Sequence, residues 1–258
     1  MRFQLGRTIF KIIVLSCLAS VTTQCADRAT SVQKQFPGVC AKDLGVGNNT
    51  SVWMVGCGKA NDSGDFYLFT WNGSKWDMMP GFGSDIAVEP NGTPWITNSG
   101  GQIYKGNGNN GWEQVAGCAR DIAVGNDSVW VLGCKQSGAK DFEILSWQGS
   151  QWNRVEGAAA RIAVEPNGTP WIVNSSGQIY KRSGNSWQQV SGCAKDIGVG
   201  ENGSVWILGC KPVGAGGFEI LSRQGSKWTT LPGAATGIAV EPNGTPWVIS
   251  IEGKVFRL

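Results

Sequence analysis

Apolar and polar residues alternate along most of the chain, in short runs separated by turns that are rich in Gly and Asn. Between residues 85 and 115 the alternation predicts strands at roughly Asp85–Glu89, Pro94–Asn98, Gln102–Lys105 and Trp112–Val115. The turns between these runs hold Asn-Gly and Gly-Gly pairs, which favour tight hairpins. The pattern therefore predicts a unit of four antiparallel strands.

This unit returns along the chain. The ten residues IAVEPNGTPW occur at Ile86–Trp95, Ile162–Trp171 and Ile238–Trp247, in equal steps of 76 residues. Each step holds two units, because an Ile-Ala-Val-like triplet followed by an Asn/Gly turn and a Trp recurs six times. A period of about 40 residues also occurs in arrays of paired helices, but the frequent Gly and the two-residue alternation exclude helices here. Four-stranded units repeated around an axis predict an all-β, six-bladed β-propeller of four-stranded blades.

The last unit indicates how the ring closes. It ends at Leu258 after three predicted strands, the third at roughly Lys254–Arg257. The N-terminal segment Ser31–Phe36 can supply the missing outer strand, which would also cover an exposed sheet edge. We expect the ring to be closed by this N-terminal strand.

Six of the eight cysteines fall into pairs, one pair in each odd-numbered unit. The pairs are Cys40 with Cys57, Cys118 with Cys134, and Cys193 with Cys210. The first Cys of each pair opens an inner strand and the second ends the next strand, so the two face each other across a hairpin. Zinc is the rival interpretation, but the chain has no His and no Cys-x-x-Cys. Three disulfides are predicted, and no metal site.

The N-terminal residues are not expected to belong to the fold. Three basic residues precede a short apolar run, Ile12–Val21, and small residues follow it. A buried helix or a membrane anchor is the alternative, but the run is too short to span a bilayer. Residues 1–25 are therefore predicted to be a secretory signal peptide, cleaved somewhere from Ala19 to Cys25, and residues 26–258 a single propeller.

Removal of that leader lowers the formal net charge from +3 to zero, because its three basic residues are its only charged residues. A near-neutral surface does not attract nucleic acid or anionic lipid. No later stretch is apolar enough to predict a transmembrane segment. The paired cysteines fit an oxidising compartment, so we expect a secreted, extracellular protein.

The absence of His excludes Ser-His-Asp and Cys-His nucleophilic sites. Paired carboxylates could still act as acid and base. However, Glu89, Glu165 and Glu241 recur in identical VEPNG turns, where a repeated residue is expected to be structural. The sequence therefore predicts a binding protein, with neither an enzymatic activity nor a cofactor.

Candidate binding residues lie near the odd units, which carry a longer loop after each second Cys. Asp43, Asp121 and Asp196 stand at matching places beside the inner strands, and Asp65 and Asp141 lie in the loops. Carboxylates at a pocket mouth can accept hydrogen bonds from sugar hydroxyls. Capping of the loop backbone is the alternative role for each of them. The threefold recurrence favours multivalent binding.

Two Trp residues lie outside the repeated Trp pattern. Trp71 and Trp147 occupy equivalent turns on the opposite face, and Arg223 takes the third equivalent place. As ligand platforms they should be largely exposed, because a flat indole can stack on a sugar or a partner protein. Packing over a neighbouring turn is the alternative.

The repeat resembles the tectonin repeat, and GTPWITNSGGQIYKGNGNNGWEQVAG at 92–117 is close to an ideal copy. The resemblance covers essentially residues 31–258. Secreted members of that family include fish-egg lectins and horseshoe-crab lectins of the tachylectin-1 type. The resemblance implies a propeller that binds carbohydrate: N-acetylglucosamine-containing or O-methylated glycans, or lipopolysaccharide in innate immunity. A secreted scaffold for a protein partner is the alternative function. The sugar and the oligomeric state are left open.

Overall fold

The computed structural model describes residues 34–36, 38–48, 51–138, 140–200 and 203–258. Its elements are β-strands, which form six antiparallel sheets of four strands each. They belong to one compact unit, Val32–Leu258, and the predicted signal peptide falls outside the described residues. The described residues include no helix with the length and apolar character needed to cross a membrane.

Three sheets form the odd blades. Blade 1 is β2 (Ala41–Val46), β3 (Val52–Lys59), β4 (Phe66–Trp71) and β5 (Trp76–Gly83); blade 3 is β10 (Ala119–Gly125), β11 (Ser128–Gln136), β12 (Phe142–Trp147) and β13 (Trp152–Ala159); blade 5 is β18 (Ala194–Val199), β19 (Val205–Val213), β20 (Gly217–Gln224) and β21 (Lys227–Ala235). In each blade the chain runs from the inner strand to the outer one.

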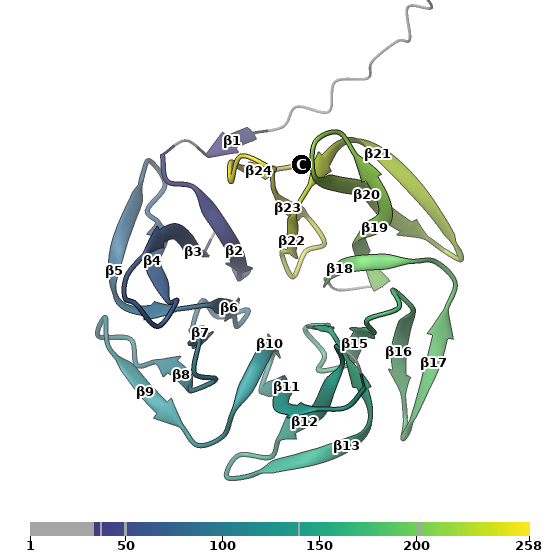
Figure 1. The fold of residues 1–258 in the computed structure, drawn as a ribbon, viewed down its shortest axis with the longest axis horizontal. Helices are drawn as coiled ribbons and strands as arrows, with labels where there is room; N and C mark the ends of the chain where they lie inside the picture. The colour runs from purple at the N-terminus through teal and green to yellow at the C-terminus, as the bar shows by residue number, and fades with distance from the viewer. Residues whose placement is uncertain (1–33, 37, 49–50, 139, 201–202) are drawn as a thin grey trace, which may run out of the picture. The chain divides into compact units, whose positions relative to one another are not determined.

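The other three sheets form the even blades. Blade 2 is β6 (Asp85–Val88), β7 (Pro94–Thr97), β8 (Ile103–Gly106) and β9 (Trp112–Val115); blade 4 is β14 (Arg161–Val164), β15 (Pro170–Val173), β16 (Ile179–Ser183) and β17 (Ser186–Val190); blade 6 is β22 (Gly237–Val240), β23 (Pro246–Ile249), β24 (Val255–Arg257) and β1 (Lys34–Phe36). The six blades surround a central axis (Figure 1), so the predicted six-bladed propeller is confirmed.

The N-terminal strand closes the ring. β1 pairs antiparallel with β24, with Lys34 opposite Arg257 and Phe36 opposite Val255. The Phe36 ring lies 4.9 Å from the Trp71 ring and 4.4 Å from the Trp247 ring, measured between centroids. The predicted closure is therefore confirmed for residues 34–36, and residues 31–33 lie outside the described part of the chain.

Small residues let the inner strands approach one another at the axis. A β-carbon on Gly45 would stand 2.7 Å from the Val88 side chain, and one on Gly198 would stand 2.6 Å from the Val240 side chain. Contacts that close would force the blades apart. The small residue in each triplet therefore sets the spacing of the inner ring.

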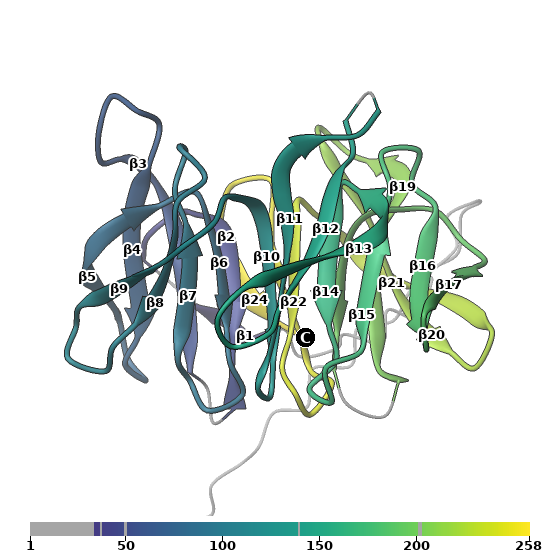
Figure 2. The same ribbon diagram turned by 90° about the horizontal axis from the view of Figure 1, so that it is seen from below.

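The three predicted disulfides are present: Cys40–Cys57, Cys118–Cys134 and Cys193–Cys210. Each joins the start of an inner strand to the strand that follows it. The β3–β4, β11–β12 and β19–β20 loops leave the sheets at the same end as these bridges, and the first two are visible on one side of the ring in Figure 2. We call this side the loop face.

Candidate functional site

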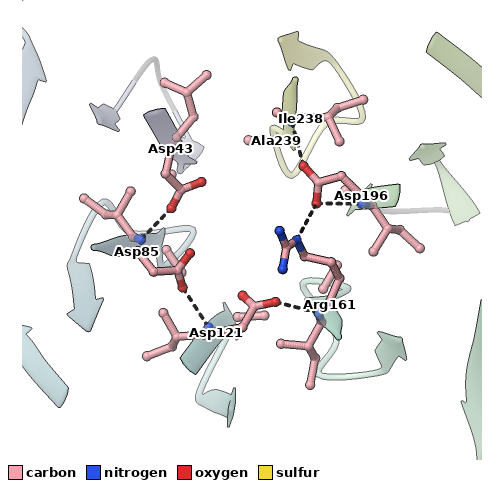
Figure 3. Close-up of a pocket in the computed structure, with 18 of the residues that line it drawn as sticks. Asp43, Asp85, Asp121, Arg161, Asp196, Ile238 and Ala239 are labelled. Carbon is pink, nitrogen blue, oxygen red and sulfur yellow. Dashed lines mark hydrogen bonds and ion pairs between the residues drawn. The ribbon is translucent and has the colours of Figure 1, made fainter. Parts of the chain in front are cut away.

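The inner strands enclose a central channel with a volume of about 400 Å³. Four carboxylates and one guanidinium point into it: Asp43, Asp85, Asp121, Asp196 and Arg161 (Figure 3). In the odd blades a β-bulge precedes the carboxylate, between Ala41 and Asp43 for example. Asp43, Asp121 and Asp196 directly follow these bulges, whereas Asp85 opens β6, whose pairing with β7 has no such shift.

Each of these carboxylates accepts a hydrogen bond from the next blade. The backbone N–H donors are Ile86 to Asp43 at 2.7 Å, Ile122 to Asp85 at 3.0 Å, Ile162 to Asp121 at 3.0 Å, and Ile238 to Asp196 at 3.1 Å. Blades 4 and 6 break the pattern, with Arg161 and Gly237 at the corresponding place. The carboxylates therefore link neighbouring inner strands, which corresponds to the backbone-capping alternative.

The channel gathers four carboxylates around Arg161, and Lys42 and Arg120 also line it. Burial raises the pKa of Asp121 to about 7 and that of Asp196 to about 6, although Arg161 acts in the opposite direction on both. Burial also raises the pKa of Asp85 well above its usual range, helped by the neighbouring Asp43. The Arg161 Nε lies 3.8 Å from an Asp196 oxygen. Among the described residues, no group of three or more carboxylates or cysteines is arranged to hold a metal ion.

The loop carboxylates lie elsewhere, at the junctions between blades. Asp65, only 5% exposed, accepts a hydrogen bond from the backbone N–H of Ser99 at 2.6 Å and another from Asn61 at 2.9 Å. Asp141 accepts from the backbone N–H of Ser175 at 2.6 Å. Each therefore fastens an inserted loop to a turn of the next blade. They do not meet the channel carboxylates in one site.

The ligand-platform interpretation requires Trp71 and Trp147 to be largely exposed, and the structure shows that they are not. Both are half-buried: Trp71 packs beside Phe36, and its ring centroid lies 5.2 Å from that of Trp76. Trp147 packs in the cluster that contains Trp95, 4.9 Å from the Trp152 ring. The structure favours the packing alternative for both residues.

The repeated VEPNG glutamates have the structural role expected for them. Glu165 is 4% exposed and accepts hydrogen bonds at 2.8 Å from both the Trp171 indole and the Lys181 ammonium. Burial alone would raise its pKa, but these donors hold the pKa below its usual value. Glu241 makes the matching contacts with Trp247 and Arg257. The glutamates anchor the turn and the second-strand Trp of each even blade.

A second cavity, of about 250 Å³, lies between blades 1 and 2. Its walls are Trp53, Met79, the Asn91–Pro94 turn, the Gly106–Gly111 turn and Trp112. The two indole rings lie 6.2 Å apart and nearly perpendicular, at 74°. This cavity, which we call the interblade pocket, combines aromatic walls with polar turns.

The interblade pocket was not predicted from the sequence. Trp112 is one of the repeated Trp residues, and its indole N–H donates to the Pro80 carbonyl of blade 1 at 2.7 Å. Within the described residues, the indole N–H of Trp53 has no hydrogen-bond partner. The available signal was local: the turn GNGNNG at 106–111 is richer in Gly than its counterpart RSGNS at 182–186.

Residues 138–212 match the Tectonin domain family. Tectonin-2 of Physarum polycephalum is 40% identical over 73 residues, which are 27% of this chain and 19% of that relative. The aligned part thus spans about a fifth of the relative's length. The family match has nearly the length of one 76-residue period, and this chain carries that period three times.

Solved structures with the same fold cover most of the chain. YCF48 bound to D1 peptide superposes with a TM-score of 0.57 at 15% identity, over 87% of this chain and 95% of that one. A streptogramin B lyase gives a TM-score of 0.57 at 13% identity, over 87% and 96%. The WD40 β-propeller domain of Doa1 gives 0.55 at 13%, over 87% and 94%. At these identities the likeness is one of fold.

Proposed function

The chain is a β-propeller built from tectonin repeats, and from that premise we propose that it is a secreted, carbohydrate-binding lectin. The ligand class follows from the family resemblance: glycans that contain N-acetylglucosamine or O-methyl sugars, including bacterial lipopolysaccharide. The observation that carries the proposal is the interblade pocket, whose size and walls suit a single sugar ring.

The pocket offers both kinds of contact that sugars need. The indole faces of Trp53 and Trp112 can stack on the apolar face of a sugar ring. Met79 and Pro80 add an apolar wall for an acetyl or methyl substituent, and the Trp53 indole N–H, which has no acceptor among the described residues, can donate to a ligand oxygen. Such a pocket favours a hexose that carries a small apolar substituent.

Secretion is supported by the three disulfides, because disulfides persist in oxidising compartments. Binding without catalysis is supported by the contacts of the carboxylates. The chain has no His, and the buried carboxylates accept hydrogen bonds from backbone groups and from the Trp, Lys and Arg residues around them. These contacts make the carboxylates part of the scaffold.

A glycan array probed with residues 26–258 tests the proposal. We expect binding to glycans with terminal N-acetylglucosamine or O-methyl groups, and its loss in the Trp112→Ala variant. Trp187→Ala is the matched control, because Trp187 occupies the equivalent place in blade 4 and makes the equivalent bond, to the Glu156 carbonyl at 2.7 Å. An array with no bound glycan would contradict the lectin proposal and favour a scaffold for a protein partner.

A further inference from the structure

We propose that the interblade pocket is open at the junction of blades 1 and 2 and closed at its two equivalents, so that the chain binds one glycan there and not three. The inference rests on the proposed function and identifies Gly106 as the residue that keeps the pocket open. In blade 4, Arg182 occupies the corresponding space. This departs from the multivalency that the threefold repeat suggests.

The equivalence of the two positions follows from strand register. Gly106 of β8 is opposite Trp112 of β9, and Arg182 of β16 is opposite Trp187 of β17. Trp112 and Trp187 each donate an indole hydrogen bond to an outer-strand carbonyl of the preceding blade. The two junctions therefore share a frame and differ in the residue beside the indole.

Arg182 covers the aromatic surface that a sugar would use in blade 4. Its guanidinium carbon lies 5.2 Å from the centroid of the Trp187 ring, a cation–π distance. Its Nη1 is buried and has no hydrogen-bond partner, so this end of the side chain lies inside the junction. In blade 2 the corresponding residue, Gly106, has no side chain, and both Gly106 and Trp112 line a cavity.

The other indole of each junction shows the same difference. In blade 3, the Trp130 indole N–H donates to the Ser128 hydroxyl at 3.0 Å. In blade 1, the equivalent Ser51 hydroxyl is directed instead to the Gly92 carbonyl, at 3.5 Å. The Trp53 indole N–H is left without a partner among the described residues. A donor is therefore available to a ligand at the first junction and is already used at the second.

The third junction is also filled. Leu258 stands at the place of Gly106, because Arg257 is paired with Trp247 as Lys105 is with Trp95. Leu258 packs in the cluster that includes Trp206, and the Trp206 indole N–H donates to the Gly244 carbonyl at 3.2 Å. The Trp206 indole donor is therefore already used, and Leu258 supplies a side chain where blade 2 has Gly106.

Two substitutions should interchange the open pocket of the first junction and the filled pocket of the second. Arg182→Gly should open the second pocket, and Gly106→Arg should fill the first. A β-carbon on Gly106 would stand 2.8 Å from Pro94, so that proline has to shift. In blade 4, Arg182 and Pro170 stand at the equivalent positions, and the strand pairing is intact. Should Gly106→Arg fail to fold, Arg182→Gly still tests whether this side chain closes the second pocket, because it removes the guanidinium that lies over Trp187.

The indole N–H signals of Trp53, Trp112, Trp130 and Trp187 in ¹H–¹⁵N NMR spectra report each junction separately. With methyl β-N-acetylglucosaminide as the probe, we expect wild-type protein to show shifts at Trp53 and Trp112 alone. Arg182→Gly should add shifts at Trp130 and Trp187 and raise the stoichiometry from one to two. Gly106→Arg should weaken binding at least tenfold.

A measurement without ligand separates this inference from the lectin proposal. In D₂O the Trp53 indole N–H should exchange faster than that of Trp130, because among the described residues only the Trp130 N–H has a hydrogen-bond acceptor. Equal exchange rates, or ligand-induced shifts at both Trp112 and Trp187 in the wild-type protein, would overturn the single open pocket while leaving a lectin function intact. A wild-type protein that binds no glycan, yet shows the expected exchange rates, would overturn the lectin function instead.

Discussion

Gly101, in the β7–β8 turn of blade 2, lies directly against the Cys118–Cys134 disulfide of blade 3: a β-carbon at Gly101 would stand 2.5 Å from the Cys118 sulfur and 2.7 Å from the Cys134 sulfur. The Ala119 backbone N–H donates to the Gly101 carbonyl at 2.9 Å across the same contact. Each disulfide thus forms part of a junction between blades as well as bracing its own blade.

Replacement of Gly101 by Ala should lower the free energy of unfolding by about 2–3 kcal/mol. The added methyl group meets the two sulfur atoms, and the φ angle of +83° is unfavourable for a residue with a side chain. Gly100→Ala is the control, because Gly100 has no positive φ and its nearest contact would be 3.4 Å. Denaturation curves of the two variants measure the difference; equal stabilities would show that the turn moves freely away from the bridge.

The channel carboxylates should make stability fall as the pH rises. Asp121 has a pKa of about 7 in the folded protein, against 3.8 ordinarily, so protonation favours folding. That contribution is complete below about pH 4 and is lost progressively as the pH rises to about 7. Glu165 and Glu241 act the other way, because their lowered pKa values make stability fall below about pH 4.5. We therefore expect maximal stability near pH 5.

Asp121→Asn isolates the channel effect, because the amide oxygen can still accept the Ile162 hydrogen bond. The loss of unfolding free energy between pH 5 and pH 8 should shrink by about 1–2 kcal/mol, less than the full pKa shift implies, because Asp121 is only half-buried and solvent screens its charge. Urea titrations at a series of pH values provide the measurement. An unchanged pH profile in this variant would mean that Asp121 ionises normally.

Removal of the Asp65 carboxylate should destabilise the junction of blades 1 and 2. Asp65→Ala leaves the Ser99 N–H without its acceptor and opens the Asn61 contact, which should cost about 2 kcal/mol. Asp62→Ala is the control within the same loop, because Asp62 is exposed. Thermal melts should separate the two, and a melting temperature lowered equally by both would argue against a specific role for Asp65.

The three channel aspartates can be tested directly as glycan ligands. Replacing Asp43, Asp121 and Asp196 together by Asn keeps an oxygen acceptor for each backbone N–H and removes the negative charge. If the glycan binds in the interblade pocket, affinity on the array should change less than about twofold. A loss of binding from a folded triple variant would place the glycan at the channel mouth.

Much of the scaffold could be predicted because its causes lie in residue type and spacing. Alternation, Asn-Gly turns and a fixed period specify blades, and paired cysteines across a hairpin specify bridges. The small central residue of inner triplets such as Leu44-Gly45-Val46 follows from crowding at the axis, which the structure shows for Gly45 and Val88. The N-terminal closing strand could be predicted because the last unit has only three strands of its own.

The roles of the candidate residues were harder to predict, because their partners are backbone groups. From the sequence alone, an Asp that accepts a hydrogen bond from the Ile86 N–H cannot be distinguished from one that binds a sugar, since every residue except Pro offers the same N–H. Trp71 lies outside the repeated Trp pattern, but it packs at a junction between blades against Phe36, which is distant in the sequence. The interblade pocket depends on Gly106 being opposite Trp112, a fact of register rather than of composition.

The pairing of β1 with β24 also fixes an order of assembly. The other five sheets form from strands that follow one another along the chain, whereas Lys34 must find Arg257. Contacts between such distant segments form slowly, because a long loop has to be closed first. Until then β24 presents an unpaired edge, which can also accept β1 from a second molecule. During synthesis, the interval before ring closure is therefore when two copies can exchange strands, and a high local concentration of nascent chains would produce swapped dimers.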